Sequence, residues 1–463
     1  MAPVTSARRW SMTGGMVFGR YRGDEPTESP AIPAPSQVVL PVGIPSPDLL
    51  VREGDSVCAG QPLVPPSRIL PRHFHLASVS GTVAAFIPHG KGMRAPVSVV
   101  LNRSPGDEHC GERFAMPSDP EAARQVLVRS GAVHGCPPDA ARWLLQPRAA
   151  PVTALLVACF ASGPLEPRRL RLAACESSHL REGLALWRSA VGGSPVVLMV
   201  AEDEAAAWRA MGAGPGETTV HPCPRRYPAE HPQMLASRHL RHDLPGGSLP
   251  LDRGLLVIDL LAVCAAGQVA ATGEALRETT VDLVGQGAVR PVTLRARIGT
   301  RAADLFKRFV VDPPPLFVGG GLLAGERLGP ESPVLPHQGT IVALRAPTRR
   351  FLSFMSPAVR RPSWTRAALS SFLPPRSLEA RAEVGGELRP CISCGACEEV
   401  CPRGISPSHL ARLAEGGFVE EMIQYGIDRC IECGLCSYVC PSKIELMAAL
   451  RRGIEAVARE QVA

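Results

Sequence analysis

Residues 37–110 alternate short apolar runs with glycine turns. The runs include VVLPVG, LLVREGD and HLASVSGTVAAFIP, and Gly54-Asp55 and Gly81-Thr82 have the composition of tight turns between strands. This pattern predicts a small all-β barrel or sandwich. The preceding residues 1–36 are rich in proline and show no periodicity, so we expect an arm that wraps around the rest of the protein.

Further along the chain, longer apolar runs are separated by helical patterns. Thr153–Phe160 (TALLVACF) and Ser194–Ala201 (SPVVLMVA) are almost continuously apolar, as in parallel strands that are buried on both faces. A helical pattern over His179–Ala190 lies between them, which predicts an α/β layer structure. The apolar run Gly254–Gly273 contains Asp259 in its first half, so we interpret it as a buried strand and a helix of small residues rather than as a membrane span.

The part of the chain before the cysteine-rich end combines β-type runs with a basic segment. Glu278–Thr300 is typical of a hairpin-rich β segment, Arg301–Arg308 of a helix, and the triplet Gly319–Gly321 of a turn. Residues 341–389 hold nine arginines against three glutamates, and we expect a linker packed over a domain surface. The alternative is a basic face for acidic lipid headgroups or an acidic partner.

Composition and charge exclude some classes of function. Hydrophobic residues make up 45% of the 463 residues, enough to bury several cores. The net charge of +7 comes mainly from dispersed arginines, without basic blocks or interleaved aromatics, so we expect no nucleic-acid partner. Met1–Arg20 lacks a continuous apolar stretch, so we expect no signal peptide.

The 15 cysteines fall into two groups. Eight lie between Cys391 and Cys440, and this density points to metal or cluster binding rather than to an extracellular disulfide framework. We expect the other seven, which follow no motif spacing, to be reduced thiols in a reducing compartment, hence in the cytoplasm. These are Cys58, Cys110, Cys136, Cys159, Cys175, Cys223 and Cys264.

Two cysteine runs near the C-terminus share one spacing. They are Cys391-x-x-Cys394-x-x-Cys397-x-x-x-Cys401-Pro402 and Cys430-x-x-Cys433-x-x-Cys436-x-x-x-Cys440-Pro441. In such runs three thiolates on a loop bind one cubane, and the fourth cysteine reaches the other cluster. We therefore predict two [4Fe–4S] clusters, the first held by Cys391, Cys394, Cys397 and Cys440 and the second by Cys430, Cys433, Cys436 and Cys401. A pair of zinc sites is the alternative, although zinc sites usually consist of two separated CxxC pairs.

Beyond these runs, the chain resembles the RnfC family, a component of the Rnf ion-translocating ferredoxin:NAD oxidoreductase, and more distantly NqrA and the flavoprotein subunit of respiratory complex I. The matching stretches are PVGIPSPDLLVREGDSVCAGQPLV, SVSGTVAAF, RRYPAEHPQML, LPGGSLPLDRGLLV, VDLVGQGAVRPVTLRARIGT, FVGGGLLAG and CIECGLCSYVCPSKIEL. The resemblance implies a multidomain α/β and β fold. Its parts are an arm (1–36), a barrel-sandwich hybrid (37–110), a Rossmann-like α/β domain (111–275), an SLBB-like β-grasp segment (276–340), the linker (341–389) and an α-helical dicluster ferredoxin-like domain (390–463).

The family's middle domain holds FMN and receives NADH through a loop of the form GxGGAGFPTxxKL, followed by a strand that ends in NGAECEP. The corresponding stretches here, SGAVHGCPPDAARWL and VACFASGPLEP, depart from this pattern. Bulkier residues replace glycines, and Pro137-Pro138 removes two N–H donors that phosphate binding needs. We therefore expect the nucleotide site to be lost, so that FMN is absent. The alternative is an altered site made by Gly131, His134, Gly135 and Arg142, although we interpret His134 as an exposed loop histidine.

The resemblance implies an electron-transfer subunit of a membrane-associated Rnf- or Nqr-like complex. It would lie peripherally on the cytoplasmic side of the inner membrane and relay electrons between ferredoxin or NADH and membrane subunits. One alternative is an FMN-dependent NADH dehydrogenase subunit with an altered nucleotide site. Another is a binding module in which the SLBB-like segment takes quinone or another small ligand.

Overall fold

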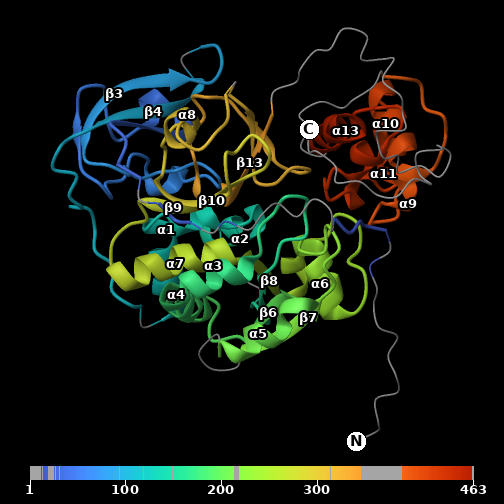
Figure 1. Cartoon of the computed structure of the whole chain (residues 1–463), viewed down its shortest axis with the longest axis horizontal. Helices are drawn as coiled ribbons and strands as arrows, with labels where there is room; N and C mark the ends of the chain where they lie inside the picture. Colours follow the sequence, from blue (N-terminus) through green and yellow to red (C-terminus); the bar gives the residue numbers. More distant parts are fainter. Residues whose placement is uncertain are drawn as a thin grey trace, which may run out of the picture.

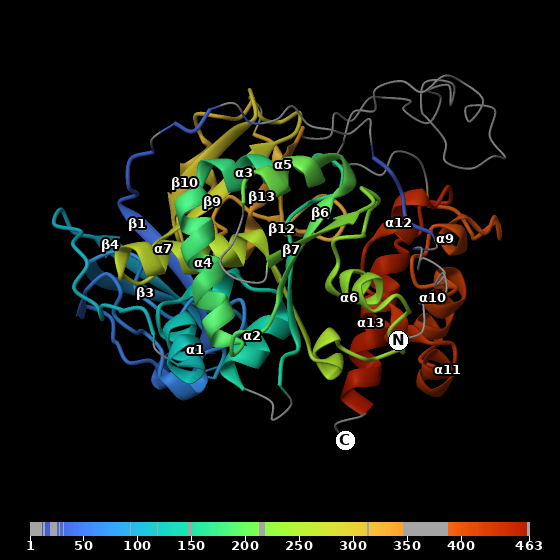
Figure 2. The ribbon, with the colours of Figure 1, turned by 90° about the horizontal axis from the view of Figure 1, so that it is seen from below.

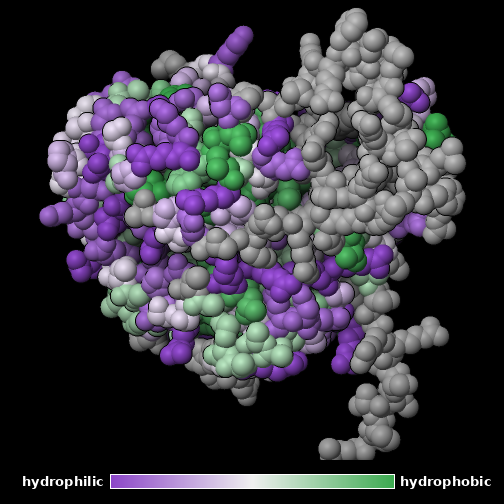
Figure 3. Space-filling view, in the orientation of Figure 1, coloured by the Kyte–Doolittle hydropathy of each residue, from purple (hydrophilic) through white to green (hydrophobic). Residues whose placement is uncertain are grey.

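Three β-sheets and a C-terminal group of helices make up the computed structural model (Figure 1). It describes residues 12, 14–18, 26, 28–30, 32–92, 94–117, 119–146, 151–212, 218–312, 314–345 and 388–460. Most of the arginine-rich linker expected over 341–389 therefore lies outside the described residues. The face in Figure 3 is mainly hydrophilic, with hydrophobic residues in small separate groups.

The first sheet is antiparallel and has the order β1-β4-β3-β2. Its strands are β1 (Gln37–Pro45), β2 (Ser56–Val57), β3 (Gly81–Pro88) and β4 (Pro96–Arg103). Val38, Leu40 and Val42 of β1 are buried and belong to the core of this unit. The predicted all-β unit is confirmed as a four-stranded antiparallel sheet. Its description as a barrel-sandwich hybrid stays a prediction.

The second sheet is parallel, with the order β7-β6-β5-β8. Its strands are β5 (Ala154–Ala158), β6 (Val196–Ala201), β7 (Thr218–Cys223) and β8 (Leu255–Asp259). The helices around it are α1 (Pro120–Arg129), α2 (Pro138–Leu145), α3 (Arg169–Cys175), α4 (Ser177–Ala190), α5 (Ala205–Ala210), α6 (Pro232–Leu240) and α7 (Leu260–Thr272). Every residue of β5 and β6 is buried, which confirms the two predicted strands.

Small residues allow α4 and α7 to pack closely. A Cβ atom on Gly183 would overlap the carbonyl oxygen of Val263, and one on Gly267 would overlap that of His179. Asp259 ends β8 and caps α7, because its carboxylate accepts a hydrogen bond of 2.8 Å from the amide of Ala262. The predicted strand and small-residue helix over Gly254–Gly273 are thus confirmed. Among the described residues, no helix is long and apolar enough to cross a membrane.

The third sheet is mixed and has the order β10-β9-β13-β11-β12. Its elements are β9 (Glu278–Val284), β10 (Val292–Arg297), α8 (Ala302–Phe306), β11 (Leu316–Gly319), β12 (Glu326–Leu328) and β13 (Thr340–Leu344). The strands β9 and β10 form the predicted hairpin. Arg171 on α3 binds Asp282 on β9 at 2.7 Å and so ties this sheet to the α/β unit.

The C-terminal helices form their own small core, made by Leu410, Met422, Ile427 and Leu450 among others. They are α9 (Ala396–Glu399), α10 (Pro407–Gly416), α11 (Val419–Gln424), α12 (Leu435–Val439) and α13 (Leu446–Glu460). Short 3₁₀ turns occupy Ser46–Asp48, Pro66–Arg68, Ala132–Gly135, Glu202–Glu204, Pro250–Arg253, Pro336–Gln338 and Ile427–Arg429. Figure 2 shows these helices on the side of the molecule where α6 lies.

One expectation about the cysteines is wrong. Cys58 and Cys110 form a disulfide, with their Cα atoms 5.8 Å apart, although both were expected to be reduced. Ala59 and His109, which are the chain neighbours of these cysteines, form a β-bridge that brings the two cysteines together. Cys136, Cys159, Cys223 and Cys264 are free thiols, as expected.

Candidate iron–sulfur site

The two cysteine loops repeat one backbone conformation. Ser393 and Glu432 occupy matching positions, and each has a φ of 53°. Gly395 and Gly434 follow, with φ angles of 72° and 79°, and each begins a short helix. A positive φ is costly for a residue other than glycine and is concentrated at functional sites. Its repetition indicates that the two loops are copies of one local structure.

The fourth cysteine of each run also lies in a repeated setting. Pro402 follows Cys401 and Pro441 follows Cys440. Three residues after each cysteine the backbone is again left-handed, at Gly404 and Lys443, both with a φ of 60°. The repeat therefore extends beyond the ligand loops and relates the two halves of the C-terminal unit residue by residue.

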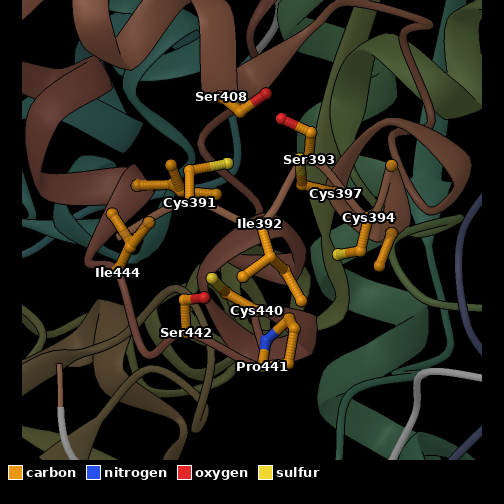
Figure 4. Close-up of a pocket in the computed structure, with 13 residues that line it drawn as sticks. Cys391, Ile392, Ser393, Cys394, Cys397, Ser408, Cys440, Pro441, Ser442 and Ile444 are labelled. Atoms are coloured by element: carbon orange, nitrogen blue, oxygen red, sulfur yellow. The ribbon is translucent and has the colours of Figure 1, made fainter. Parts of the chain in front are cut away.

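The structure groups the eight cysteines into two cavities, each with four. One cavity, of about 370 Å³, is lined by Cys391, Cys394 and Cys397 of the first run and by Cys440 of the second (Figure 4). The other, of about 330 Å³, is lined by Cys430, Cys433 and Cys436 of the second run and by Cys401 of the first. We call them the first and second cavity. Each therefore receives its fourth cysteine from the other run.

The donor set of each cavity fits an iron–sulfur cluster. Burial raises the pKa of the Cys430 thiol to about 11 and that of Cys433 to about 12, and it also raises the pKa of Cys397. Such thiols lose their protons when a bound metal supplies positive charge. Within the part of the chain that the structure describes, no three or more His, Cys, Asp or Glu side chains form a group suited to a single metal ion.

The two cavities differ in their exposure to solvent. Cys391 and Cys394 are exposed, and Ile392 between them is 63% exposed. The second loop instead packs inward, where the carbonyl oxygen of Cys433 accepts a hydrogen bond of 2.7 Å from the hydroxyl of Tyr227. Gly434 lies against the carbonyl oxygen of Leu323 so closely that a Cβ atom would overlap it. The first cavity thus faces outward and the second faces the rest of the protein.

A pair of carboxyl groups lies behind Tyr227, near the carboxyl end of β5. The hydroxyl of Ser162 donates a hydrogen bond to Glu230, and Glu166 lies close enough to Glu230 to repel its charge. Burial and this repulsion raise the pKa of Glu166 to about 7, against the opposing effect of Arg169. Burial also raises the pKa of Glu230. Glu166 lies in the stretch VACFASGPLEP and Glu230 in RRYPAEHPQML, but the sequence does not indicate that the two residues meet, because 64 positions separate them.

The stretch predicted to correspond to the nucleotide loop lies inside the protein, which makes one expectation about it wrong. His134 is buried rather than exposed, and its Nε2 lies 2.6 Å from Nδ1 of His75. Gly131 and Gly135 are buried too, whereas Arg142 is exposed on α2. The sequence could not indicate this burial, because the partner of His134 comes from the first sheet unit.

Hydrogen bonds within this loop already use some of its backbone donors. The amide of His134 donates to the carbonyl of Gly131, and that of Cys136 to the carbonyl of Val133, each over 3.2 Å. A loop that cradles phosphate needs free N–H groups that point into an open space. The residues present therefore do not fit a phosphate-binding loop.

Two repeated loops, each lining a four-cysteine cavity on a helical unit, have the arrangement expected of a dicluster iron–sulfur domain. The family model described as "4Fe-4S dicluster domain" matches residues 390–444. Over most of its length, the chain has homologues that are named as the C component of the ion-translocating oxidoreductase complex. The protein of Rhodobacter capsulatus is 25% identical over 422 residues, 86% of this chain and 74% of that protein. The protein of Edwardsiella ictaluri is 26% identical over 443 residues, 90% of this chain and 50% of that protein. The predicted resemblance to the RnfC family is confirmed.

The chain spans about half the length of the Edwardsiella ictaluri protein. Among solved structures, it is similar to a chain in "Crystal structure of NAD+-reducing [NiFe]-hydrogenase in the air-oxidized state", with a TM-score of 0.44 and 14% identity. That match covers 73% of this chain and 66% of the other.

Proposed function

We propose that the chain is the iron–sulfur subunit of an ion-translocating oxidoreductase complex and relays single electrons through two [4Fe–4S] clusters. The observation that carries this proposal is the grouping of the eight cysteines, four to a cavity, with the fourth cysteine exchanged between the runs. Cys391, Cys394, Cys397 and Cys440 would hold the first cluster. Cys430, Cys433, Cys436 and Cys401 would hold the second. When bound, such clusters accept and release one electron at a time.

The first cavity faces outward and the second faces the rest of the protein, which supports a direction of electron transfer through the protein. An external redox partner can approach the first cavity, because the loop that contains Cys391 and Cys394 lies at the surface. The second cavity contacts the α/β unit and the mixed sheet through Tyr227 and Leu323. We infer that electrons are exchanged with ferredoxin or another soluble carrier at the first cavity. Membrane subunits of the complex, at the cytoplasmic side of the inner membrane, are the other proposed partners.

We infer further that this subunit works without FMN. The buried His134 and the internal hydrogen bonds of its loop support this inference, because they use backbone amides that a bound phosphate would need. NADH oxidation would then take place elsewhere in the complex, and the α/β unit would serve as a scaffold. The names barrel-sandwich hybrid and SLBB for the first and third sheet units remain part of this proposal.

Anaerobic purification of the chain, followed by metal and flavin analysis, tests the proposal. We expect about eight irons per chain, because each cubane holds four, a broad visible absorbance that dithionite bleaches, and no acid-released flavin. Two zinc ions per chain in place of iron would overturn the proposal as a whole. One FMN per chain would overturn only the inference that the nucleotide site is lost. Co-purification with membrane subunits tests the assignment to a complex.

A further inference from the structure

The internal repeat sets two buried residues in equivalent positions beside the two cavities. Arg403 is the second residue after Cys401, and Ser442 is the second residue after Cys440. Both are buried, Arg403 at 4% and Ser442 at 3% exposure. Arg403 lines the second cavity and Ser442 lines the first, where Figure 4 shows it beside Cys440. The repeat thus differs at this point by one full charge.

Two carboxylates, Asp243 and Asp428, and a second arginine, Arg429, act on the charge of Arg403. One terminal nitrogen donates a hydrogen bond of 2.8 Å to the carbonyl of Leu244, and Nε donates to the carbonyl of Arg429 over 3.4 Å. Its ion-pair contact with Asp243 is long, at 3.8 Å, and the Asp243 side chain is 63% exposed. Burial lowers the pKa of Arg403, but the guanidinium of arginine stays protonated in proteins. A positive charge therefore borders the second cavity.

The first cavity has no counterpart to this charge. Its lining residues are cysteines, serines, glycine, proline, alanine and aliphatic residues, with no charged side chain among them. The hydroxyl of Ser442 donates a hydrogen bond of 2.9 Å to the carbonyl of Pro390. Because the two loops otherwise have the same backbone conformation, the two cavities can be compared directly, and they differ in the charge at the position of Arg403 and Ser442.

We propose that Arg403 raises the reduction potential of the cluster in the second cavity and so favours electron transfer from the outward cavity to the inward one. Reduction adds one electron and hence one negative charge to the cluster, and a guanidinium nearby in a low-dielectric site stabilises the charge that is added. Burial acts in the opposite direction, because exclusion of water disfavours the more negative state. The charge of Arg403 offsets that cost. The inference rests on the proposed occupation of both cavities.

A redox titration of the full-length, anaerobically purified chain tests this role, with dithionite as the electron donor and both clusters followed by electron paramagnetic resonance. We expect Arg403→Gln to lower the affinity of one cluster for its electron at least tenfold, which is a fall of about 59 mV for a one-electron couple. The potential of the other cluster should not move. Arg403→Lys, which keeps the charge, should restore most of the potential. Arg412→Gln is the matched control, because it removes an exposed arginine from the same helical unit.

The iron content separates failure of this inference from failure of the proposed function. A wild-type chain without iron would overturn the proposed function, and with it the premise for Arg403. Eight irons per chain in Arg403→Gln, with both potentials unchanged, would overturn the role of Arg403 alone. If Arg403→Gln does not retain iron, Asp243→Asn removes a surface charge that opposes Arg403. It should then raise the potential of the same cluster, and a fall or no change would contradict the inference.

Discussion

At the scale of single residues, the spacing of the cysteines was sufficient to predict which four share a cavity. Cys401 and Cys440 are equivalent positions of the repeat, 39 residues apart, and each lines the cavity of the other run. The reason is local: a loop of three cysteines leaves one corner of a cubane without a ligand, and the fourth cysteine follows a short helix that leads away from the loop. The sequence also shows that Arg403 and Ser442 differ in charge. Their effect on a bound cluster depends on their burial beside the cavities, which only the structure shows.

Paired serine substitutions test the exchange of the fourth cysteine. We expect Cys391→Ser and Cys440→Ser each to lower the iron content from about eight to about four per chain, because each removes a ligand of the same cluster. The double variant should also keep about four irons. Cys391→Ser combined with Cys401→Ser should instead lose nearly all iron. The buried free thiol Cys223 gives the control, since Cys223→Ser should leave the iron content unchanged. Equal iron loss in both double variants would contradict the exchange.

At the scale of elements, the hydrophobic pattern predicted the strands and α7, but it did not predict contacts between elements that are distant in the sequence. Continuous apolar runs gave β5 and β6, because strands buried on both faces have no polar positions to alternate with. The burial of His134 depends on His75, which is 59 positions earlier, and the disulfide joins cysteines 52 positions apart. The hydrophobic periodicity of a segment carries no information on such distant pairs. For this reason His134 was expected to be exposed, and Cys58 and Cys110 were expected to be reduced.

The burial of His75 and His134 should make the protein sensitive to acid. Burial lowers the pKa of His75 to about 4 and that of His134 well below its ordinary value. Both histidines are therefore neutral in the folded protein but titrate near 6.5 when it unfolds. Their contribution to stability is complete above pH 6.5 and is lost as the pH falls toward 4, by up to about 3 kcal/mol for His75. Urea unfolding at pH 7.5 and pH 5 measures this loss.

The variant His75→Gln should reduce the dependence of the unfolding free energy on pH between 7.5 and 5, whatever its effect at a single pH. His242→Gln, at an exposed position, serves as the control and should leave the pH dependence unchanged. An identical pH dependence in His75→Gln and the unsubstituted protein would show that other groups cause the loss at low pH.

The close packing of α4 on α7 gives a second prediction at this scale. Alanine is usually better than glycine in a helix by roughly 1 kcal/mol. At Gly267, however, the added Cβ would overlap the backbone of His179, which cannot move without displacing α4. We expect Gly267→Ala to destabilise the protein by about 1–3 kcal/mol, as overpacking does. Thermal unfolding measures the effect, and Ala271→Ser at an exposed position of α7 controls for a small change in volume. A rise in the melting temperature of Gly267→Ala would contradict the close contact.

At the scale of the whole molecule, the α/β unit, the mixed sheet and the C-terminal helices meet around Tyr227. Its hydroxyl reaches Cys433, and Phe18 packs edge-on against both Tyr227 and Tyr438, with ring centroids 6.0 and 5.6 Å away. The carboxyl pair of Glu166 and Glu230 lies behind this junction. Because these residues come from four distant parts of the sequence, the composition of each part indicated a domain but not the junction between them.

The carboxyl pair should destabilise this junction at high pH. The pKa of Glu166 is raised to about 7, from 4.5, so the folded protein favours the protonated acid. Its contribution to stability is complete below pH 4.5 and is lost as the pH rises to 7, by up to about 3 kcal/mol. We expect Glu166→Gln, which imitates the protonated acid, to raise the melting temperature at pH 8 and to leave it nearly unchanged at pH 4.5.

Glu415→Gln is the matched control, because it removes an exposed carboxylate from the surface of α10. It should have no comparable effect at pH 8, and an equal gain in both variants would mean that a general reduction of charge, rather than the junction, is responsible. Between pH 4.5 and 6.5 the carboxyl pair and the buried histidines act in opposite directions, because stability from the histidines rises with pH while stability from Glu166 falls. The loss of stability toward pH 4 then arises where the first sheet unit meets the α/β unit, and the loss toward pH 7 arises where the α/β unit meets the second cavity.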